Sequence, residues 1–511
     1  MHGWFAVALT CVQPFVASNG WAAIERTEEA PLSEASDACI TCHETATPGI
    51  VADWARSRHA TVTPSAALAM PEMSRRVSNP DIPDSLSSIV VGCAECHLQR
   101  ASAHADSYDH NGYLIHTVVT PMDCAACHPS EQGQYAQNLM SNAHVNLTNN
   151  DVYQQFMSAT NDLVSWRHLE LAGTAMDSAT NNMSCYFCHG TKVTVDGFAE
   201  RNTVFGAMTF PKLTGWPNRG VGRMNPDGTM GACTPCHARH QFSIEVARQP
   251  YTCSECHKGP DVPAYKIYSV SKHGNIYSSM RSTYDFSAVP WTVGEDFNAP
   301  TCAVCHVSLI QNTDGDIVAR RTHQMNNRID TRIFGLIYAH PHPRSPETWH
   351  IRNEAGLQLP TNFDGSFVSE ALIDEQEQKR RRTEMQTVCR ACHSRQWVDG
   401  HFRQFDHVNT VTNEQTKTAT AIMGTVWQDG LAAGLATADN PFDEAIEKLW
   451  IEHWFFYANT VRLATAMAGA DYGVFANGRF QLARNIQEMA DYYRLLDRTR
   501  QTPLKGESPG R

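Results

Sequence analysis

Apolar positions recur at helical spacing mainly in the C-terminal part of this chain. After the turn residues Asn477-Gly478, apolar side chains are three or four residues apart, which predicts a helix with one apolar face: Leu482, Ile486, Met489, Tyr493 and Leu496. Asn440-Pro441 provides an N-cap and a first-turn proline for a preceding helix that runs towards Gly469. The pattern therefore predicts a C-terminal domain over 396–511 that is a bundle of long helices.

The region before this bundle has few long apolar runs. Its connections are rich in Gly, Pro and Asn, as in Gly215–Gly231, and Asp227-Gly228 and Asp314-Gly315 are turn signals that allow minor strand content. A charged helix is expected over Glu375–Val388. We predict a mainly α fold in which residues 23–395 form short helices joined by irregular loops.

An apolar segment lies near the N-terminus, over Trp4–Val16. It has the length of a signal-peptide core and is too short to span a bilayer. No basic residue precedes it, which is atypical of such a leader. We expect residues 1–22 to be a signal peptide, and no transmembrane anchor is predicted elsewhere.

The cysteines lie in repeats of one short motif, Cys-x-x-Cys-His, and each repeat is called a word. Of the 17 cysteines, only Cys11 lies outside these words. The attachment words comprise the cysteine pairs Cys39/Cys42, Cys93/Cys96, Cys124/Cys127, Cys185/Cys188, Cys233/Cys236, Cys253/Cys256, Cys302/Cys305 and Cys389/Cys392. The histidines that complete them are His43, His97, His128, His189, His237, His257, His306 and His393.

This word is typical of covalent c-type haem attachment. Two thiols spaced i and i+3 bond the vinyl groups on one haem edge, and the next imidazole becomes the proximal iron ligand. Structural zinc is the alternative, but zinc has no use for a histidine directly after every cysteine pair. The sequence therefore predicts eight covalently bound haem c groups in residues 23–395, in the periplasm or an equivalent extracytoplasmic compartment.

The formal net charge is −12 at pH 7. Such a charge disfavours nucleic acid as a ligand. A cytochrome with a basic face is the natural electrostatic complement.

Distal iron ligands must come from the remaining histidines. The chain has 24 histidines, enough to close every iron with a second imidazole. His240 follows His237 by three residues and emerges on the same side, so it must serve another haem. The expected distal ligands are His59, His116, His144, His240, His273, His323 and His401, with His340, His342, His350 and His407 as alternates.

Three features together resemble the octahaem hydroxylamine oxidoreductases and the related hydrazine dehydrogenases. They are the eight words, the segment CHARHQFSIEVARQPYTCSECHKGPD followed by Ser271–Gly274, and the tail segment GADYGVFANGRF. The resemblance implies a homotrimer of mostly helical subunits in which seven bis-histidine haems relay electrons. It also implies that the fourth haem is five-coordinate, catalytic, and cross-linked to a tyrosine of the adjacent subunit.

Carried onto this sequence, the resemblance makes the haem of Cys185, Cys188 and His189 the catalytic one. The cross-linking residue corresponds to Tyr472, and the proton-accepting acid to Asp261 in the stiff Gly-Pro-Asp turn. Tyr338 is a further candidate pocket residue. The family's histidine after the acid is Val262 here, and Val474-Phe475-Ala476-Asn477 replaces aromatic residues and a histidine near the tyrosine.

Three functions are consistent with these features. The first is oxidation of hydroxylamine or hydrazine at the fourth haem, with electrons leaving to a c-type cytochrome. The second is the reverse use of the same site, reducing nitrite or hydroxylamine to ammonia. The third is a pure electron-transfer cytochrome in which all eight irons are closed.

Overall fold

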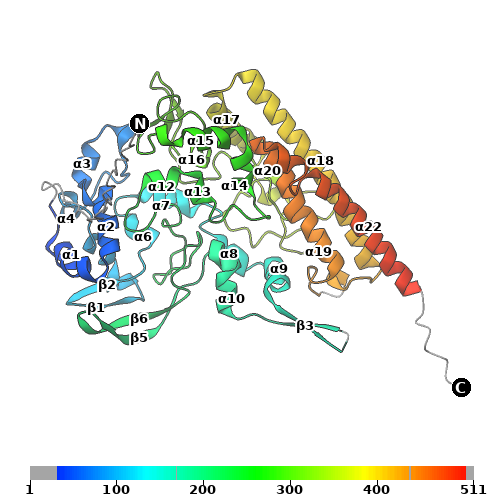
Figure 1. Cartoon of the computed structure of the whole chain (residues 1–511), viewed down its shortest axis with the longest axis horizontal. Coiled ribbons are helices and arrows are strands. Elements are labelled where there is room, and N and C mark those ends of the chain that lie inside the picture. Colours follow the sequence, from blue (N-terminus) through cyan, green and yellow to red (C-terminus); the bar gives the residue numbers. More distant parts are fainter. Residues whose placement is uncertain (1–30, 169, 437–438, 502–511) are drawn as a thin grey trace, which may run out of the picture.

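The computed structural model describes residues 31–168, 170–436 and 439–501. The expected signal peptide at 1–22 lies outside these residues. Short helices dominate the first three quarters of the chain, and long helices dominate the last quarter (Figure 1). The mainly α fold predicted from the sequence is confirmed.

The haem-word region consists of short helices separated by loops. Those helices are α1 (Glu34–Ala46), α2 (Pro48–Ala55), α3 (Pro64–Ala69), α4 (Asp84–Ser87), α5 (Ala94–His97), α6 (Pro121–Cys124), α7 (Pro129–Ala136), α8 (Ala143–Thr148), α9 (Asp151–Asn161), α10 (Ser178–Met183), α11 (Cys185–His189), α12 (Ile244–Arg248), α13 (Pro250–Cys253), α14 (Ala264–Val270), α15 (Lys272–Met280) and α16 (Cys302–His306). The turn of helix at an attachment word places its two thiols on one side, because residues three apart share a helix face.

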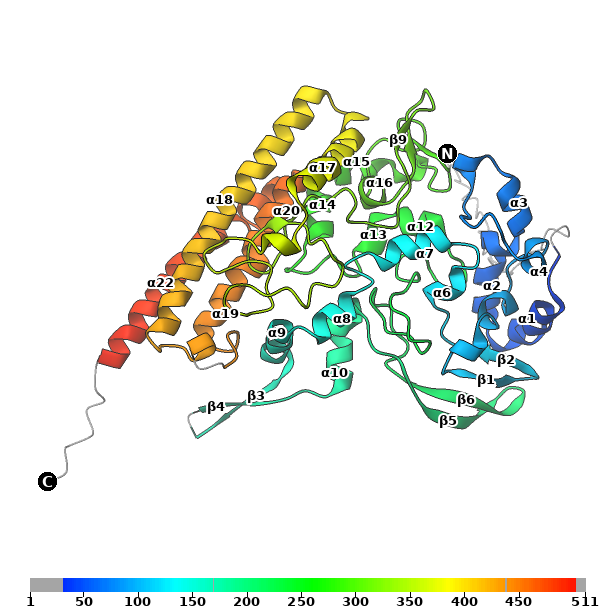
Figure 2. The same cartoon turned by 180° about the vertical axis from the view of Figure 1, so that it is seen from behind.

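Strands are few and mostly paired as hairpins. They are β1 (Ser107–His110), β2 (Tyr113–His116), β3 (Leu163–Arg167), β4 (Glu170–Thr174), β5 (Thr194–Thr203), β6 (Gly206–Thr214), β7 (Trp291–Thr292), β8 (Ile310–Gln311), β9 (Ile317–Ala319), β10 (Thr331–Arg332) and β11 (His340–Pro341). The predicted turn at Asp314-Gly315 lies between β8 and β9, where Gly315 has φ +86. The long β5–β6 hairpin and the β3–β4 hairpin run along one edge of the molecule (Figure 2).

The C-terminal helices lie side by side (Figure 1). They are α17 (Glu375–Arg390), α18 (Arg395–Gln428), α19 (Ala445–Ile451), α20 (Asn459–Met467), α21 (Ala470–Val474) and α22 (Arg479–Gln501). The helix predicted at Glu375 and the apolar face predicted on α22 are both confirmed, with Leu482 and Met489 buried. Among the described residues, no helix combines the length and the apolar character that crossing a bilayer needs.

The helix predicted to start at Asn440-Pro441 begins later. Glu444 is the N-cap of α19, and its carboxylate and that of Glu447 form a capping box. Asn440 instead accepts from the Phe442 amide and donates to the Gln155 carbonyl, which ties this loop to α9. The helix then continues through a π-helical turn at Glu452–Ala458 into α20, and it ends at Ala468 with a left-handed φ of 54° before Gly469.

The largest apolar core joins the helical bundle to the haem-word region. Met423, Trp450 and Met489 of the bundle pack with Val152 of α9 and with Ile337. The predicted boundary between 395 and 396 falls at the start of α18, but the core crosses it. The division into two domains therefore stays a prediction.

Candidate active site and haem-binding residues

A branched cavity of about 1920 Å³ runs through the haem-word region. Cysteines from seven of the eight words line it, together with apolar side chains such as Val304, Leu309 and Ile310. The sixteen described cysteines form no disulfide. Unpaired thiols in i, i+3 pairs on the wall of an apolar cavity fit covalent attachment of flat apolar groups, so the residues present fit haem c.

The first word is the exception, because it stands apart from this cavity. Its residues Cys39, Cys42 and His43 lie on α1 at the edge of the fold (Figure 1), and neither thiol is on the cavity wall. Cys39 and Cys42 are half-buried, as are the cysteines of the other words apart from the exposed Cys392, and α1 packs on α2 and α5. The cavity therefore does not support haem attachment at Cys42. Attachment there stays a prediction from the Cys-x-x-Cys-His spacing.

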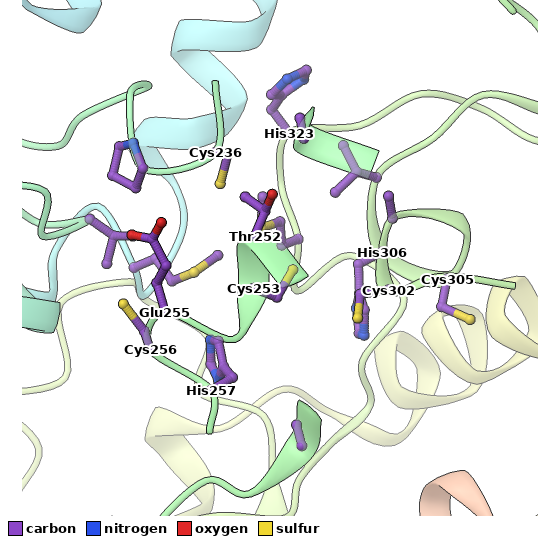
Figure 3. Close-up of a pocket in the computed structure, with 18 of the residues that line it drawn as sticks. Cys236, Thr252, Cys253, Glu255, Cys256, His257, Cys302, Cys305, His306 and His323 are labelled. Atoms are coloured by element: carbon purple, nitrogen blue, oxygen red, sulfur yellow. The ribbon is translucent and has the colours of Figure 1, made fainter. Parts of the chain in front are cut away.

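Neighbouring words approach one another through their thiols. The sixth word lies at the centre, because Cys253 and Cys256 are flanked by Cys236 of the fifth word and Cys302 of the seventh (Figure 3). The thiol of Cys256 also interacts with the thiol of Cys188 of the fourth word. The fourth word therefore meets the others at the sixth.

The remaining words extend this arrangement in two directions. Electrostatic interactions between thiols follow the order first–second–third–fifth–sixth–seventh–eighth. The thiol pairs are Cys39/Cys93, Cys96/Cys127, Cys124/Cys233, Cys236/Cys253, Cys253/Cys302 and Cys305/Cys389. Groups bound to successive words would be neighbours. The fourth word is a branch from the sixth.

Four proximal histidines face a second imidazole at about the distance that separates the two histidine rings of a bis-histidine haem. The ring centroids are 6.1–6.4 Å apart, as expected when an iron lies between two imidazoles: His43/His110 at 6.2 Å, His128/His59 at 6.3 Å, His237/His323 at 6.4 Å and His393/His273 at 6.1 Å. Of these partners, His59, His273 and His323 are predicted distal ligands. His110 was missed, although it stands directly before the Asn111-Gly112 turn of the β1–β2 hairpin.

The second word pairs differently. The ring of His116 is 6.0 Å from that of His97, but the His116 carbonyl lies 2.8 Å from Nδ1 of His97 and accepts its proton. His116 is therefore on the Nδ1 side, away from the nitrogen that would bind iron. His240 interacts electrostatically with His97 and supplies the distal candidate for this word.

His116 belongs instead to a buried polar cluster. Its ring stacks on that of His104 at 3.6 Å, and His104 contacts the carboxylates of Asp106 and Asp123 at 3.4 and 3.2 Å. Burial lowers the pKa of His104, but the two carboxylates outweigh it and raise the pKa to about 9. Because the two imidazoles are stacked with only 13° between their planes, their lone pairs cannot converge on one metal ion.

Two other predicted distal ligands do not face a proximal ring. Nδ1 of His144 lies 2.6 Å from the Gly190 carbonyl, directly after the fourth word. His401 is separated from His393 by Trp397, whose indole stacks on both rings at 4.0 and 5.4 Å. Assigning either residue to an iron stays a prediction.

His189 of the fourth word is acted on by two opposite charges, Asp261 and Arg332. Within residues 31–168, 170–436 and 439–501, no imidazole stacks or faces it at the bis-histidine spacing, which is also true of His257 and His306. Burial lowers the pKa of His189, and Asp261 acts in the opposite direction. Arg332 is the next charge that acts on this ring.

Asp261 lies where the fourth and sixth words meet. It lines the cavity and acts electrostatically on Cys188 and His257 as well as on His189. Its backbone carbonyl accepts from the Asn459 side chain of α20, which fixes the turn against the helical bundle. Its neighbour Val262 packs into an apolar cluster with Ile267 and Leu463 and offers no proton-carrying group.

Neither of the two candidate tyrosines is among the residues that line the cavity. Tyr338 is fully buried in the core shared with the bundle, and its hydroxyl donates to the Phe363 carbonyl at 2.7 Å. Burial raises the pKa of Tyr338 to about 12. Tyr472 is half-buried on α21 and packs against the cluster around Ile267. A contact between Tyr472 and the fourth word would therefore have to come from another subunit.

Comparisons with known proteins agree with this arrangement. A family model described as "Seven times multi-haem cytochrome CxxCH" matches residues 214–333. A solved structure named "Hypothetical multiheme protein" is 39% identical, has a TM-score of 0.86, and covers 92% of this chain and 97% of its own.

Two proteins of Kuenenia stuttgartiensis are also similar. A "Probable nitrite reductase-hydroxylamine oxidoreductase fusion protein" is 28% identical over 296 residues, which are 54% of this chain and 26% of the relative. The chain thus spans about a quarter of the length of that curated relative. A solved "reducing HAO-like protein complex" has a TM-score of 0.57 at 20% identity and covers 92% of this chain and 86% of its own. The chain belongs to the multihaem c-type cytochromes.

Proposed function

We propose that the chain is an oxidoreductase that converts a small nitrogen compound at the haem of the fourth word. The observation that carries this proposal is that His189 has no facing imidazole among the described residues and is acted on by both Asp261 and Arg332. His257 also lacks a facing imidazole, but only Asp261 of these two acts on it. All eight words hold the full set of two thiols and an imidazole, so eight haems are proposed per chain. A haem with an open position supplies one site for a nitrogen ligand and exchanges electrons singly.

The residues around the site have separate roles in this proposal. Asp261 holds or delivers the proton that accompanies each electron, because charge accumulating in a buried pocket would oppose the reaction. The contact between Cys188 and Cys256 makes the group of the sixth word the nearest neighbour of the fourth. The other seven words then form the route between the site and a c-type cytochrome partner.

Oxidation of hydroxylamine or hydrazine is the first candidate, because it follows from the resemblance of the sequence. Reduction of nitrite or hydroxylamine to ammonia is the second. It is favoured by Val262, whose apolar side chain packs away from proton chemistry and leaves Asp261 without the neighbouring histidine of the oxidising enzymes. It is also favoured by the name of the similar Kuenenia protein, which joins a nitrite reductase to a hydroxylamine oxidoreductase.

A homotrimer with a Tyr472 cross-link to the neighbouring fourth haem belongs to the same proposal. The exposed β3–β4 hairpin supports a subunit contact near that site. Its cross-strand pair Trp166 and Leu171 is 64% and 69% exposed, and an isolated two-stranded hairpin is only marginally stable in water. β4 leads directly into α10 and the fourth word.

The proposed compartment is the periplasm or its equivalent, where c-type haem is attached. The experiment that tests the function is a two-way assay on the purified holoprotein. Hydroxylamine should release electrons to an oxidised acceptor, or nitrite should consume electrons from a reduced donor. Activity in neither direction, from a protein with all its haems, would contradict the enzyme proposal.

A further inference from the structure

Arg332 on β10 is a half-buried cation without a counter-charge. Its Nε is buried and has no hydrogen-bond partner, and within the described ranges its guanidinium makes no ion pair. Other arginines on the cavity wall are satisfied. Arg321 pairs with Glu131 at 3.1 Å, and Arg328 donates to the carbonyls of Val304 and Cys305.

The fold holds Arg332 beside the fourth word. In the β10–β11 ladder Arg332 is paired with His340, so the two side chains share one face. Arg332 lines the same cavity as His189 and Asp261. Its neighbours Ile333 and Phe334 pack in one apolar cluster with Val262, the residue after Asp261, which brings β10 close to the Gly-Pro-Asp turn.

The neighbours of Arg332 do not neutralise it. Nδ1 of His340 lies 2.7 Å from the Pro341 carbonyl and Nδ1 of His342 lies 3.0 Å from the Pro343 carbonyl, so each ring donates there and leaves Nε2 unprotonated. The remaining close side chain is apolar, with the Phe334 ring 5.9 Å from the guanidinium carbon.

Arg332 and Asp261 flank the site without joining. Both act on His189, yet no ion pair connects them in the part of the chain that the structure describes. An uncompensated buried charge is costly, and a guanidinium presents a fork of donors that matches two oxygens of one anion. A ligand that meets both groups would be negative towards Arg332 and would accept protons from Asp261.

We propose that Arg332 binds a small oxyanion substrate of the nitrite class at the fourth word and thereby sets the specificity of the site. This inference rests on the proposed function and decides between its two directions, because hydroxylamine and hydrazine carry no negative charge for Arg332 to bind. Nitrite presents two oxygens to the guanidinium while its nitrogen stays free to face the site.

The test compares an anionic with an uncharged ligand on purified holoprotein. Nitrite is titrated against the oxidised protein, and carbon monoxide against the reduced protein, both by absorption. The variants are Arg332→Gln, Arg332→Lys and, as a matched control, Arg219→Gln. Arg219 also lines the cavity, but it is 68% exposed and lies 3.7 Å from Glu255.

Arg332→Gln should weaken nitrite binding at least about tenfold, because a charge-assisted bidentate contact is lost. Arg332→Lys should lose less nitrite affinity, since lysine keeps the positive charge and lacks only the paired donors of the guanidinium. Carbon monoxide affinity should stay unchanged in every variant, and Arg219→Gln should bind nitrite like the unchanged protein. If Arg332→Gln does not assemble, the affinity of the unchanged protein for nitrite is measured at increasing chloride concentration instead. Chloride should weaken nitrite binding and leave carbon monoxide binding unaffected.

Two outcomes would overturn the inference while leaving the proposed function intact. One is unchanged nitrite affinity in Arg332→Gln. The other is an equal loss of nitrite and carbon monoxide binding, which would show that Arg332 pairs with a haem carboxylate. A protein that binds neither ligand before any substitution would overturn the open site and this inference together.

Discussion

The thiol of Cys188 interacts with the thiol of Cys256 where the fourth word meets the sixth. This contact joins the fourth word to the sixth, and the sixth word in turn contacts the fifth and the seventh. The fourth word is therefore the end of a branch and the others form a continuous row. A reacting group at the end of a branch can exchange electrons with the row without interrupting it.

The pairing of His273 with His393 predicts how the eighth iron is closed. His273→Ala should open this iron and add one carbon monoxide per chain to the reduced protein, because the ring facing His393 at 6.1 Å is removed. His401→Ala is the matched control. It lies behind Trp397 and should leave the carbon monoxide stoichiometry unchanged. The reverse result would make His401 the ligand.

Asp261 is predicted to be the proton-carrying group of the site. Asp261→Asn keeps the shape of the side chain but removes its charge and basicity. Steady-state turnover should fall by ~10²–10⁴-fold, as is usual when a general acid or base is lost. The haem content should be unchanged, since Asp261 carries no attachment thiol. Turnover equal to that of the unchanged protein would leave Asp261 as a turn residue only.

If the site works in the oxidising direction, we expect Tyr472 to link subunits covalently. Denaturing gels stained for haem should show bands up to trimer, since a covalent bond survives the loss of packing. Tyr472→Phe should give monomer alone, because phenylalanine lacks the phenol oxygen that activates the ring. Monomer from the unchanged protein, together with an open haem, would instead support the reductive direction.

The His104 cluster predicts a pH dependence of stability. The pKa of His104 is raised to about 9, so the contribution of the imidazolium is complete below about pH 6.5 and is lost as the pH rises through 9. The thermal unfolding midpoint should therefore fall between pH 7 and pH 10. His104→Gln should be less stable at pH 7, by roughly 1–3 kcal/mol, and should lose this dependence. An equal fall in both proteins would assign it to other groups.

The sequence predicts the attachment residues without knowledge of the fold, because thiols and imidazole lie within five consecutive positions. It predicts α17 and α22 because their polar or apolar periodicity is continuous. It does not predict α18, whose buried stripe contains Asn409, Thr412 and Thr416, so that its 34 residues lack a clear apolar face.

Distal ligands are harder to predict, since they depend on which segments the fold brings opposite each word. His110 and His116 stand at the two ends of one hairpin, and local sequence does not tell which of them faces a haem. The position of Cys42 away from the cavity wall could not be predicted either, because the spacing within a word does not show which segments the fold packs around it. Arg332 shows this limit too, since its missing counter-charge becomes evident only when the surrounding chain is in place.

The central claim is that one of eight irons is open and that it belongs to the fourth word. The direct measurement is the number of carbon monoxide molecules bound by the fully reduced protein, with haem counted by intact mass of the denatured chain. We predict eight haems and one carbon monoxide per chain. Eight haems that bind no carbon monoxide would contradict the claim and leave a protein that only transfers electrons.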